Sequence, residues 1–568
     1  MTNYQFTGGT ICAPATIPGT GAISIIRVSG KEALAIADKV IDTKGVPIAE
    51  TEGYRLRYGT VFEADGSVLD NVIVSVFRAP HSYTGENSVE ISCHASRFIV
   101  NKILELLVNA GARIAAPGEF TRRAFVNGKM DLAQAEAVAD VIASQSAASH
   151  RVAMNQLKGG FSSELKVLRE KLLTMTSLLE LELDFSEEDV EFASRKELGQ
   201  LVDDSLTHIG RLTASFSRGN AIKNGIPVAI VGATNTGKST LLNALLGEER
   251  AIVSDIAGTT RDTIEETLNI DGILFRFIDT AGIRETDETI EKIGIDRTFK
   301  KLGEAAVVLG MTDLSRGEAA VLEDADFILS KVNEMGGVKN VGLAIDGAET
   351  GGAHPAGADG ASLAGTGGAS LAETGGAHLA ETDGTSLAET DGASQHGHGD
   401  GQERKVVILV NKCDVAGDFY RDDNGTGYGS GNDLGENMAE IGGNKNVNHD
   451  NNIVSLIENK YDNCKVIPIS AKTGKGLSTL TKTLGEIGSE ITGSTDETLV
   501  TNVRHYEALV RAASALDRVR AGLHIATLPP DLIAQDLREA LYHLGEIVGE
   551  ISTDETLGNI FRNFCVGK

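Results

Sequence analysis

Hydrophobic and polar positions alternate early in the chain and follow other patterns later. The alternating runs at residues 22–28 and 72–76 predict half-buried strands, and residues 98–109 predict a helix. Continuous β-branched runs at 227–232 and 406–410 instead predict the fully buried strands of a parallel sheet. The sequence therefore predicts an α+β part followed by an α/β part.

Helical spacing dominates on both sides of the buried-strand region. Apolar residues recur three and four positions apart in two stretches. They are Leu165, Leu168, Leu172, Met175 and Leu179 in the first stretch, and Leu509, Ala512, Ala513, Leu516 and Val519 in the second. Because similar helices precede and follow the α/β part, we expect that part to be inserted into a single helical domain.

The predicted fold class is multidomain α/β, with a P-loop domain inserted in a helical domain. The expected domains are an α+β domain over residues 1–120, a first helical part over 121–220, a nucleotide-binding domain over 221–495 and a second helical part over 496–568.

Two low-complexity insertions are predicted within the nucleotide-binding domain, near residues 315–402 and 416–455. In the first, an eight-residue unit repeats with one leucine per unit and many glycines. Such a repeat buries too little surface to offset its ordering entropy. A small solenoid is the alternative, but the unit lacks the large residues that such stacks bury.

Composition and charge limit the cell compartments and the partners that the sequence predicts. The chain has 568 residues, a formal net charge of −28 and five scattered cysteines without metal-type spacing, which we interpret as free cytosolic thiols. No stretch of eighteen apolar residues occurs and no basic-then-apolar leader opens the sequence, so we expect a cytoplasmic protein without membrane spans. If RNA is the substrate, a local basic patch or a basic partner must hold it, because the overall charge is acidic.

Five motifs follow one another through the second half of the chain. They are GATNTGKS at 232–239, GTTRD at 258–262, DTAG at 279–282, NKCD at 411–414 and SAK at 470–472. The first lies between a predicted strand and a predicted helix, as a P-loop requires. Together they predict a nucleotide site that is specific for guanine, and hence a GTPase.

Each motif supplies a defined chemistry. Gly232 and Gly237 let backbone N–H groups point at phosphate oxygens. Lys238 would bridge the β- and γ-phosphates, and the Ser239 hydroxyl would hold Mg²⁺. The Asp414 carboxylate accepts from guanine N1–H and N2–H₂, which adenine lacks, so a buried unpaired carboxylate would reject adenine.

The switch residues would sense the γ-phosphate. Thr260 would join Mg²⁺ while the γ-phosphate is present, Asp279 would reach the metal through water, and Gly282 would offer its N–H to the γ-phosphate. The GTP-binding residues that the motifs predict are Asn235, Thr236, Gly237, Lys238, Ser239, Thr240, Gly258, Thr259, Thr260, Asp279, Thr280, Ala281, Gly282, Asn411, Lys412, Asp414, Ser470, Ala471 and Lys472.

The glutamine that orients water in many small GTPases is replaced by Ile283, which cannot form that hydrogen bond. Another group must therefore orient the water, and another cation must neutralise the developing charge. The candidate carboxylates that follow are Glu285, Asp287, Glu288 and Glu291, and the residues alone do not choose among them. A solvated helix N-terminus is the alternative interpretation of this acidic segment.

With these motifs and the two ends taken together, the chain resembles the tRNA-modifying GTPase family MnmE, also called TrmE. The resemblance covers nearly the whole chain outside the two insertions. The segments that carry it are residues 18–21 and 27–30, 82–86 with Glu90, 117–124, 129–136, 251–262 and the terminal CVGK at 565–568.

The resemblance implies an N-terminal domain that binds a tetrahydrofolate derivative (5-formyl or 5,10-methylene) and mediates homodimerisation. It implies joint action with MnmG (GidA), a partner that uses FAD and NADH. Together the two would install aminomethyl or carboxymethylaminomethyl groups at C5 of the wobble uridine, position 34, of certain tRNAs. The positions that match the family's folate contacts are Arg27, Glu90, Lys129 and Lys568.

The resemblance also implies a potassium ion in place of an arginine finger. The matching ion ligands are Asn235, Ser254, Ile256 and Thr259, and backbone carbonyls of a flexible loop suit potassium. The same loop adds Ser254, Asp255, Ile256 and Ala257 to the predicted GTP-binding residues. Glu291 matches the family's water-orienting carboxylate and is preferred over the other three candidates. The implied magnesium ligands are Ser239, Thr260 and, through water, Asp279.

Cys565 is assigned to the catalytic site with its role left open. Its thiol could be a nucleophile, which would need a low-pKa thiolate, but the attack on the pyrimidine could equally come from the flavin partner. Two other functions compete with tRNA modification. One is a regulatory or ribosome-assembly GTPase that binds RNA and modifies nothing. The other is a stand-alone folate-dependent aminomethyltransferase with a fused GTPase, which leaves the inserted position of the GTPase unexplained.

Overall fold

The structure is a computed structural model, in which the chain forms two compact units. One unit comprises residues 1–228, 238–286 and 470–568, and the other comprises residues 229–237 and 287–469. The residues that the structure describes are 8–184, 195–249, 266–278, 305–334, 404–414, 453–461, 464–493, 497–524, 529–551, 554–562, 564 and 567.

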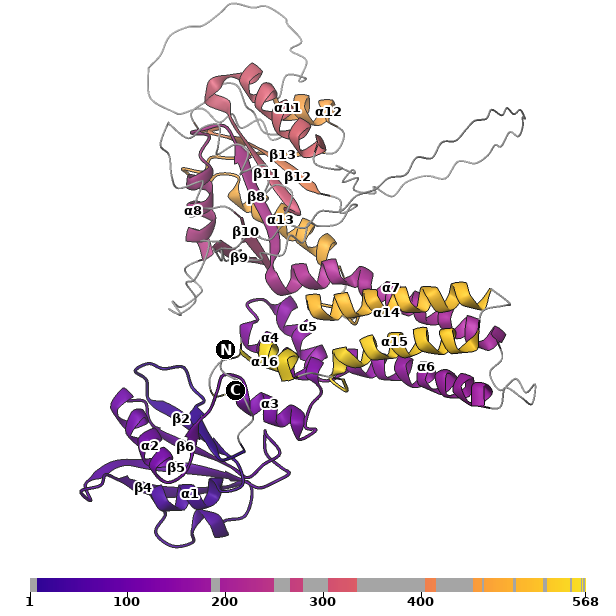
Figure 1. The fold of residues 1–568 in the computed structure, drawn as a ribbon. Coiled ribbons are helices and arrows are strands. Elements are labelled where there is room, and N and C mark those ends of the chain that lie inside the picture. Colours follow the sequence, from indigo (N-terminus) through magenta and orange to yellow (C-terminus); the bar gives the residue numbers. More distant parts are fainter. Residues whose placement is uncertain are drawn as a thin grey trace, which may run out of the picture. The chain divides into compact units, whose positions relative to one another are not determined.

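The N-terminal part of the chain forms a sheet in the order β3-β4-β5-β6-β2-β1-β7. Strands β4, β5, β6 and β2 of this sheet are labelled in Figure 1. Its strands are β1 (Ile11–Pro14), β2 (Ile23–Ser29), β3 (Ile41–Asp42), β4 (Arg55–Phe62), β5 (Val68–Phe77), β6 (Ser88–His94) and β7 (Arg113–Ile114). Neighbouring strands are antiparallel except β1 and β7, which are parallel. The short element η1 (Ile48–Glu50) lies between β3 and β4.

One face of this sheet carries the core. Alternate residues of β2, β5 and β6 pack against α1 (Ala33–Val40) and α2 (Arg97–Asn109), among them the fully buried Ile26, Val74 and Ile91. Period-two alternation places every second side chain on this covered face. The strand predicted at 22–28 is β2 and the helix predicted at 98–109 is α2, so both predictions are confirmed.

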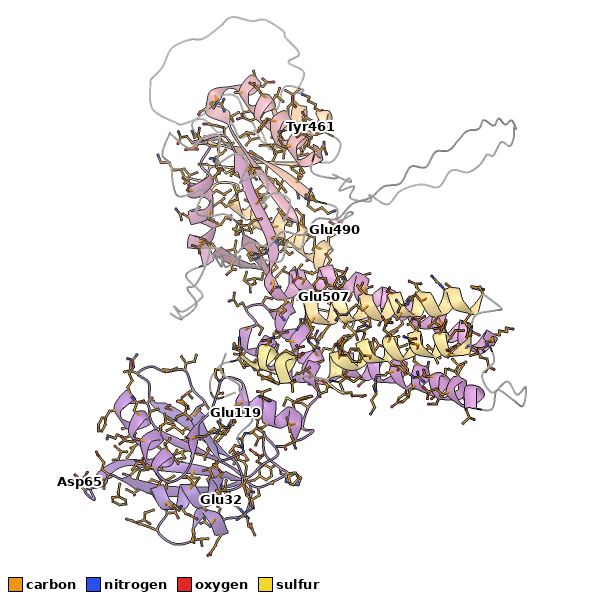
Figure 2. All side chains as sticks on the ribbon, viewed as in Figure 1. Glu32, Asp65, Glu119, Tyr461, Glu490 and Glu507 are labelled. Carbon is orange, nitrogen blue, oxygen red and sulfur yellow. The ribbon has the colours of Figure 1, made fainter. Side chains whose placement is uncertain are left out.

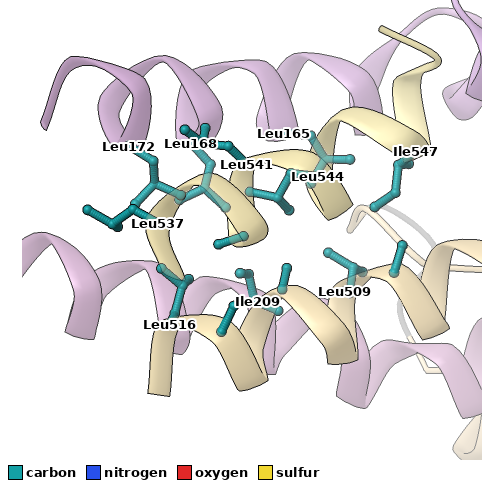
Figure 3. Close-up of a cluster of buried hydrophobic side chains, with 14 of the residues drawn as sticks. Leu165, Leu168, Leu172, Ile209, Leu509, Leu516, Leu537, Leu541, Leu544 and Ile547 are labelled. Atoms are coloured by element: carbon teal, nitrogen blue, oxygen red, sulfur yellow. The ribbon is translucent and has the colours of Figure 1, made fainter. Parts of the chain in front are cut away.

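The rest of this unit is mainly helical. Its helices are α3 (Glu119–Val126), α4 (Leu132–Ala143), α5 (Ala147–Leu157), α6 (Gly160–Asp184), α7 (Arg195–Asn224), α14 (Val503–Leu523), α15 (Pro530–Val548) and α16 (Asp554–Arg562). Helices α6, α7, α14 and α15 share one apolar core. Figure 3 shows that Leu165 and Leu172 of α6 face Leu537 and Leu541 of α15 across this core. Helices from both ends of the chain therefore build a single domain, as their apolar stripes predict.

A buried ionic cluster joins α4 to α14 and α15. His505, which is 2% exposed, places Nε2 at 2.6 Å from Glu136 Oε2. Arg504 donates to the second Glu136 oxygen at 3.0 Å and to the backbone carbonyl of Glu546 at 2.7 Å. Burial alone would raise the pKa of Glu136, but the charges and hydrogen bonds of His505 and Arg504 outweigh it and hold this pKa at about 2.

A second sheet has the strand order β13-β12-β11-β8-β10-β9, and the division between the two units falls within β8. Its strands are β8 (Ile226–Gly232), β9 (Glu266–Ile270), β10 (Ile273–Phe277), β11 (Val307–Asp313), β12 (Lys405–Asn411) and β13 (Lys465–Pro468). The β9–β10 pair is an antiparallel hairpin, whereas β10 with β8, β11 with β12 and β12 with β13 are parallel. The accompanying helices are α8 (Lys238–Glu249), α11 (Glu318–Glu334), α12 (Ile453–Lys460) and α13 (Leu477–Thr492). This arrangement confirms the predicted multidomain α/β fold class.

The predicted start of the first low-complexity insertion, near residue 315, is wrong. After the short element η3 (Leu314–Arg316), α11 packs Val321, Ala325 and Val332 into the interior. The end of the second insertion, predicted near 455, likewise overlaps α12, where Ile453 is buried. The repeated units of the first insertion lie outside the described residues. The remaining domain boundaries stay predictions.

Candidate functional site

The P-loop is the turn between β8 and α8. Gly232 has φ +155°, and a Cβ on it would overlap the carbonyl oxygen of Met311. Gly237 has φ +98°, and a Cβ there would lie 2.5 Å from Asn411 Nδ2. Both positions need glycine, because left-handed backbone and close approach each exclude a side chain. Asn235 also has a positive φ, 61°, in a conformation for which asparagine is enriched.

The Asn-Lys-Cys-Asp motif is hydrogen-bonded to the P-loop. Asn411 is 3% exposed, and its Nδ2 donates to the carbonyl oxygen of Thr236 at 2.7 Å. Thr236 is fully buried and donates its hydroxyl to the carbonyl of Ala233 at 2.9 Å. The structure therefore brings two motifs together that lie about 175 residues apart in sequence. Asp414 follows them, half-buried.

A third residue at this edge of the sheet was missed by sequence reasoning. Asp313, at the end of β11, accepts from Lys412 Nζ at 2.6 Å and from the Ser315 hydroxyl at 2.6 Å. Burial would raise the pKa of Asp313, but these hydrogen bonds outweigh it and lower the pKa. The signal available in the sequence was an aspartate directly after a buried strand. Lys412 is held in place by this ion pair.

The Ser-Ala-Lys motif follows β13 directly. Ile469 N donates to Val410 O at 2.8 Å, and Cys413 N donates to Ile469 O at 3.2 Å, which extends the pairing of β12 with β13. The next residue, Ser470, is fully buried, and its N–H donates to Lys475 O at 2.9 Å. Ala471 is buried and Lys472 is exposed. Backbone hydrogen bonds therefore fix this loop without a ligand.

Lys238, Ser239 and Thr240 form the first turn of α8, where backbone N–H groups lack partners within the helix. Burial lowers the pKa of Lys238. A bound polyphosphate would stabilise the charged form of this side chain and would itself be stabilised by the helix N-terminus.

Several predicted site residues lie outside the described residues. They are Ser254, Asp255, Ile256, Ala257, Gly258, Thr259, Thr260, Asp279, Thr280, Ala281, Gly282, Glu291, Cys565 and Lys568. Of the implied magnesium ligands, only Ser239 is described. Within the described part of the chain, no group of three or more His, Cys, Asp or Glu side chains is placed to hold a metal ion.

The predicted folate residues Arg27 and Glu90 are cross-strand neighbours on β2 and β6. Their side chains form an ion pair at 2.8 Å, and Arg27 Nη1 lies 3.4 Å from the carbonyl oxygen of Gly567. The guanidinium stacks over Tyr83, 5.0 Å from the ring centroid. Lys129 is exposed and donates to Pro80 O at 3.1 Å. The structure thus brings Arg27, Glu90 and the C-terminal segment together.

Gly567 fits tightly against β1. It is buried, has φ +97°, and a Cβ on it would overlap the carbonyl oxygen of Pro14. Only glycine suits this position. The neighbouring Lys568 lies outside the described residues, so its predicted contact with folate stays a prediction.

The same part of the chain contains a buried ion network that the sequence did not predict. Arg123 is 2% exposed and binds Glu119 and Glu86, each at 3.0 Å. Glu119, labelled in Figure 2, also pairs with Arg113 at 2.5 Å. Burial would raise the pKa of Glu119, but its hydrogen bonds, chiefly to Arg113, outweigh burial and lower the pKa. The network locks α3 to the loop that carries Tyr83.

The strand–loop–helix at 226–249, with Asn411 bonded to the loop and glycines where only glycine fits, defines the class. The α/β part is a P-loop nucleotide-binding domain of the GTPase type.

Comparisons with known proteins identify the family. The model for the MnmE helical domain matches residues 132–565, and the model for the GTP-binding protein TrmE N-terminus matches residues 10–129. The chain belongs to the MnmE family, and it is a GTP hydrolase by class.

Two relatives illustrate the similarity. The tRNA modification GTPase MnmE of Parabacteroides distasonis is 43% identical over 562 residues, which is 98% of this chain and 100% of the relative. The protein of that name from Bacteroides thetaiotaomicron is 42% identical over 98% of this chain and 99% of its own length.

One solved structure, a Sulfolobus solfataricus GTP-binding protein in complex with GDP, is 14% identical. The match covers 58% of this chain and 67% of that chain, with a TM-score of 0.24. In the described part of the chain, none of the helices has the length and apolar character needed to cross a membrane.

Proposed function

We propose that this chain is a potassium-dependent GTPase that acts in tRNA wobble-uridine modification. With a flavoprotein partner of the MnmG type, it would install the (carboxymethyl)aminomethyl group at C5 of uridine 34, using a one-carbon tetrahydrofolate. The carrying observation is the full-length match to relatives named tRNA modification GTPase, at 43% identity over 98% of the chain. Cytoplasmic tRNA is the expected substrate.

The proposed folate site is supported by the chemistry of the side chains around Arg27. Arg27 and Glu90 offer a guanidinium and a carboxylate side by side, 14% and 25% exposed. A folate carries an anionic glutamate tail, which a guanidinium can bind, and a pterin with paired donors, from which a carboxylate can accept. Tyr83 and Phe120 supply aromatic surface within 5.6 Å of the guanidinium carbon.

The proposed potassium site is supported by the P-loop backbone. The exposed Asn235 occupies the left-handed conformation at the turn of the loop, and an amide oxygen is a suitable ligand for potassium. Its proposed co-ligands Ser254, Ile256 and Thr259 lie outside the described residues. A cation here would stand near the transferred phosphoryl group and neutralise developing charge.

GTP turnover is expected to be about tenfold or more faster in KCl than in NaCl at equal ionic strength, because only potassium replaces the missing arginine finger. Asn235→Ala should abolish the difference, and Glu291→Ala should lower turnover in both salts without weakening GTP binding. The measurement is steady-state phosphate release together with the affinity for a fluorescent GTP analogue.

Thr234→Ala, an exposed change in the same loop, serves as the matched control and should retain the salt preference. Equal wild-type rates in potassium and sodium would remove the ion from the mechanism. Nucleoside analysis of tRNA then tests the pathway: cells in which the gene is deleted should lack the modified uridine 34. Unchanged tRNA would favour the regulatory GTPase instead.

The proposed homodimer is supported by the open face of the N-terminal sheet. Tyr58 and Ile73 are direct cross-strand partners and are 66% and 48% exposed, and Leu56 nearby is 68% exposed. These side chains point away from α1 and α2, whose core lies on the other face. Adjacent exposed apolar side chains of this kind mark an interaction surface.

Tyr58→Asp with Ile73→Asp is expected to weaken self-association about a hundredfold or more, because each buried apolar side chain contributes roughly 1.5–3 kcal/mol. Light scattering coupled to gel filtration should show the mass fall to that of one chain. Phe98→Asp on α2 is the matched control, since Phe98 is 58% exposed but belongs to the covered side of the sheet. A dimeric double variant would show that this face is not the interface.

A further inference from the structure

One face of α5 lines a wide surface cavity that the nucleotide and folate sites do not use. The cavity has a volume of about 850 Å³. The residues that α5 and its C-cap contribute recur three and four positions apart: Ala147, His150, Arg151, Met154, Asn155 and Lys158. The opposite face of α5 buries Val152, Ala153 and Gln156. The helix is therefore anchored on one side and presents a fixed surface on the other.

The cavity wall is cationic although the chain is strongly acidic. His150, Arg151 and Lys158 are exposed, and none of the residues lining the cavity is an aspartate or glutamate. The net charge of the whole chain is −28. The acidic Asp140 on the neighbouring helix α4 is paired with Lys223 at 2.8 Å, which neutralises it. The local potential therefore favours an anion.

The remaining lining side chains are hydrogen-bonding groups rather than apolar ones. Ser144, Gln145 and Asn155 come from the helical domain, and Asn269 comes from β9. Asn269 is held in place, because its Nδ2 donates to Gln145 O at 2.9 Å and its Oδ1 accepts from Gly272 N at 3.1 Å. Amide and hydroxyl groups beside Arg and Lys are the usual partners of phosphate and sugar oxygens.

The distance between the cationic side chains along α5 favours an extended polyanion over a single compact ion as the ligand. Arg151 and Lys158 are seven residues apart, which corresponds to about 10 Å along the axis of α5 and its C-cap. The openness of the cavity to solvent and this spacing suit a strand with successive phosphates. A compact anion would instead need convergent donors in an enclosed site.

We propose that the α5 cavity binds the phosphate backbone of the RNA substrate. This inference rests on the proposed function, because it takes tRNA as that RNA. It supplies the local basic patch that an acidic RNA-binding chain requires. Arg151 and Lys158 contribute the positive charge, and His150 contributes ring nitrogens that can form hydrogen bonds.

The experiment measures binding of an end-labelled tRNA transcript to the full-length protein by fluorescence anisotropy, over a series of KCl concentrations. His150→Ala with Arg151→Ala and Lys158→Ala should raise Kd about tenfold or more. The slope of log Kd against log salt should fall by about two, since each cation–phosphate contact contributes about one. Arg151→Lys with Lys158→Arg keeps the charge and should retain most of the affinity.

Lys166→Ala with Lys171→Ala and Lys196→Ala is the matched control, because these exposed lysines lie on α6 and α7 of the same domain. The control should leave Kd within about twofold. GTP turnover without RNA should be unchanged in the cavity variant, which shows that the protein is folded.

Three results would overturn the inference. If the cavity and control variants weaken binding equally, the effect is general charge loss. If millimolar inorganic phosphate displaces the tRNA fully, the cavity is a small-anion site. If wild-type protein binds tRNA and the cavity variant binds it as tightly, RNA lies elsewhere and the proposed function still stands. Failure of the wild type to bind any tRNA would instead count against the proposed function itself.

Discussion

Asp414→Asn is expected to weaken GTP binding about a thousandfold and to create affinity for XTP. The predicted role of the Asp414 carboxylate is to accept from both N1–H and N2–H₂ of guanine, whereas an amide would present a donor to one of them. Two mismatched polar groups cost about 4 kcal/mol together, which corresponds to about 10³ in Kd. Xanthine carries an oxygen at C2 and so matches the amide donor.

The structure supports this predicted change of nucleotide preference, because contacts that do not involve Asp414 hold the surrounding residues in place. Asn411 is bonded to Thr236, and Lys412 is paired with Asp313. Titration with fluorescent GTP and XTP analogues gives the two affinities. Asp326→Asn, an exposed aspartate on α11, is the matched control and should bind GTP normally. A variant that keeps its preference for GTP would show that Asp414 does not read the base.

Glu136→Gln is expected to destabilise the helical domain by about 3–5 kcal/mol, because it leaves the charges of Arg504 and His505 buried without their partner. Hydrogen–deuterium exchange of the α4 and α14 amides measures this locally, which matters because a multidomain chain does not unfold in two states. Glu180→Gln removes an exposed partner of Arg538 and should change exchange little. Equal exchange in both variants would mean that the buried cluster adds no stability.

The same cluster predicts a particular pH dependence. The pKa of Glu136 is about 2 in the folded protein and 4.5 in its unperturbed state. A depressed folded pKa contributes stability that is complete above pH 4.5 and is lost as the pH falls toward 2. The difference corresponds to roughly 3 kcal/mol. Glu136→Gln should flatten the dependence of α14 exchange on pH within this window, and an unchanged slope would contradict the assignment.

The apolar pattern predicted the architecture well because burial follows periodicity. The stripe of Leu165, Leu168 and Leu172 and the stripe of Leu509 and Leu516 are buried in one shared core, although more than 300 residues separate them. Each stripe requires a partner surface, and the other stripe was available to cover it.

Polar interactions inside the fold were not predictable in the same way. Glu136 and His505 are far apart in sequence, and each alone looks like an ordinary residue of a solvated helix face. Asp313 occurs singly at a strand end, without a spacing pattern to identify its partner Lys412. The start of the insertion was misplaced because Ala and Glu in α11 resemble the repeats that follow.

The candidate site was more predictable than its surroundings. The motifs predicted that Asn411 and the P-loop belong to one site, because binding a guanine nucleotide restricts the residue types in each motif. The Gln145–Ser146 corner and α5 carried no motif, and their shared cavity emerges only when the helix and β9 are placed together.

The shared helical core has a consequence for synthesis on the ribosome. Helices α6 and α7 are complete by Asn224, but the α14 and α15 residues that cover them begin only at Val503. At about 5–20 residues per second, the ribosome needs roughly 15–60 s to translate the intervening chain. During that interval Leu165, Leu168, Leu172 and Ile209 lack the surface that buries them in the finished protein. The α/β part is contiguous and can fold during this interval. The apolar residues of α6 and α7 stay exposed until α14 and α15 are translated, because the helical domain is split by the α/β part.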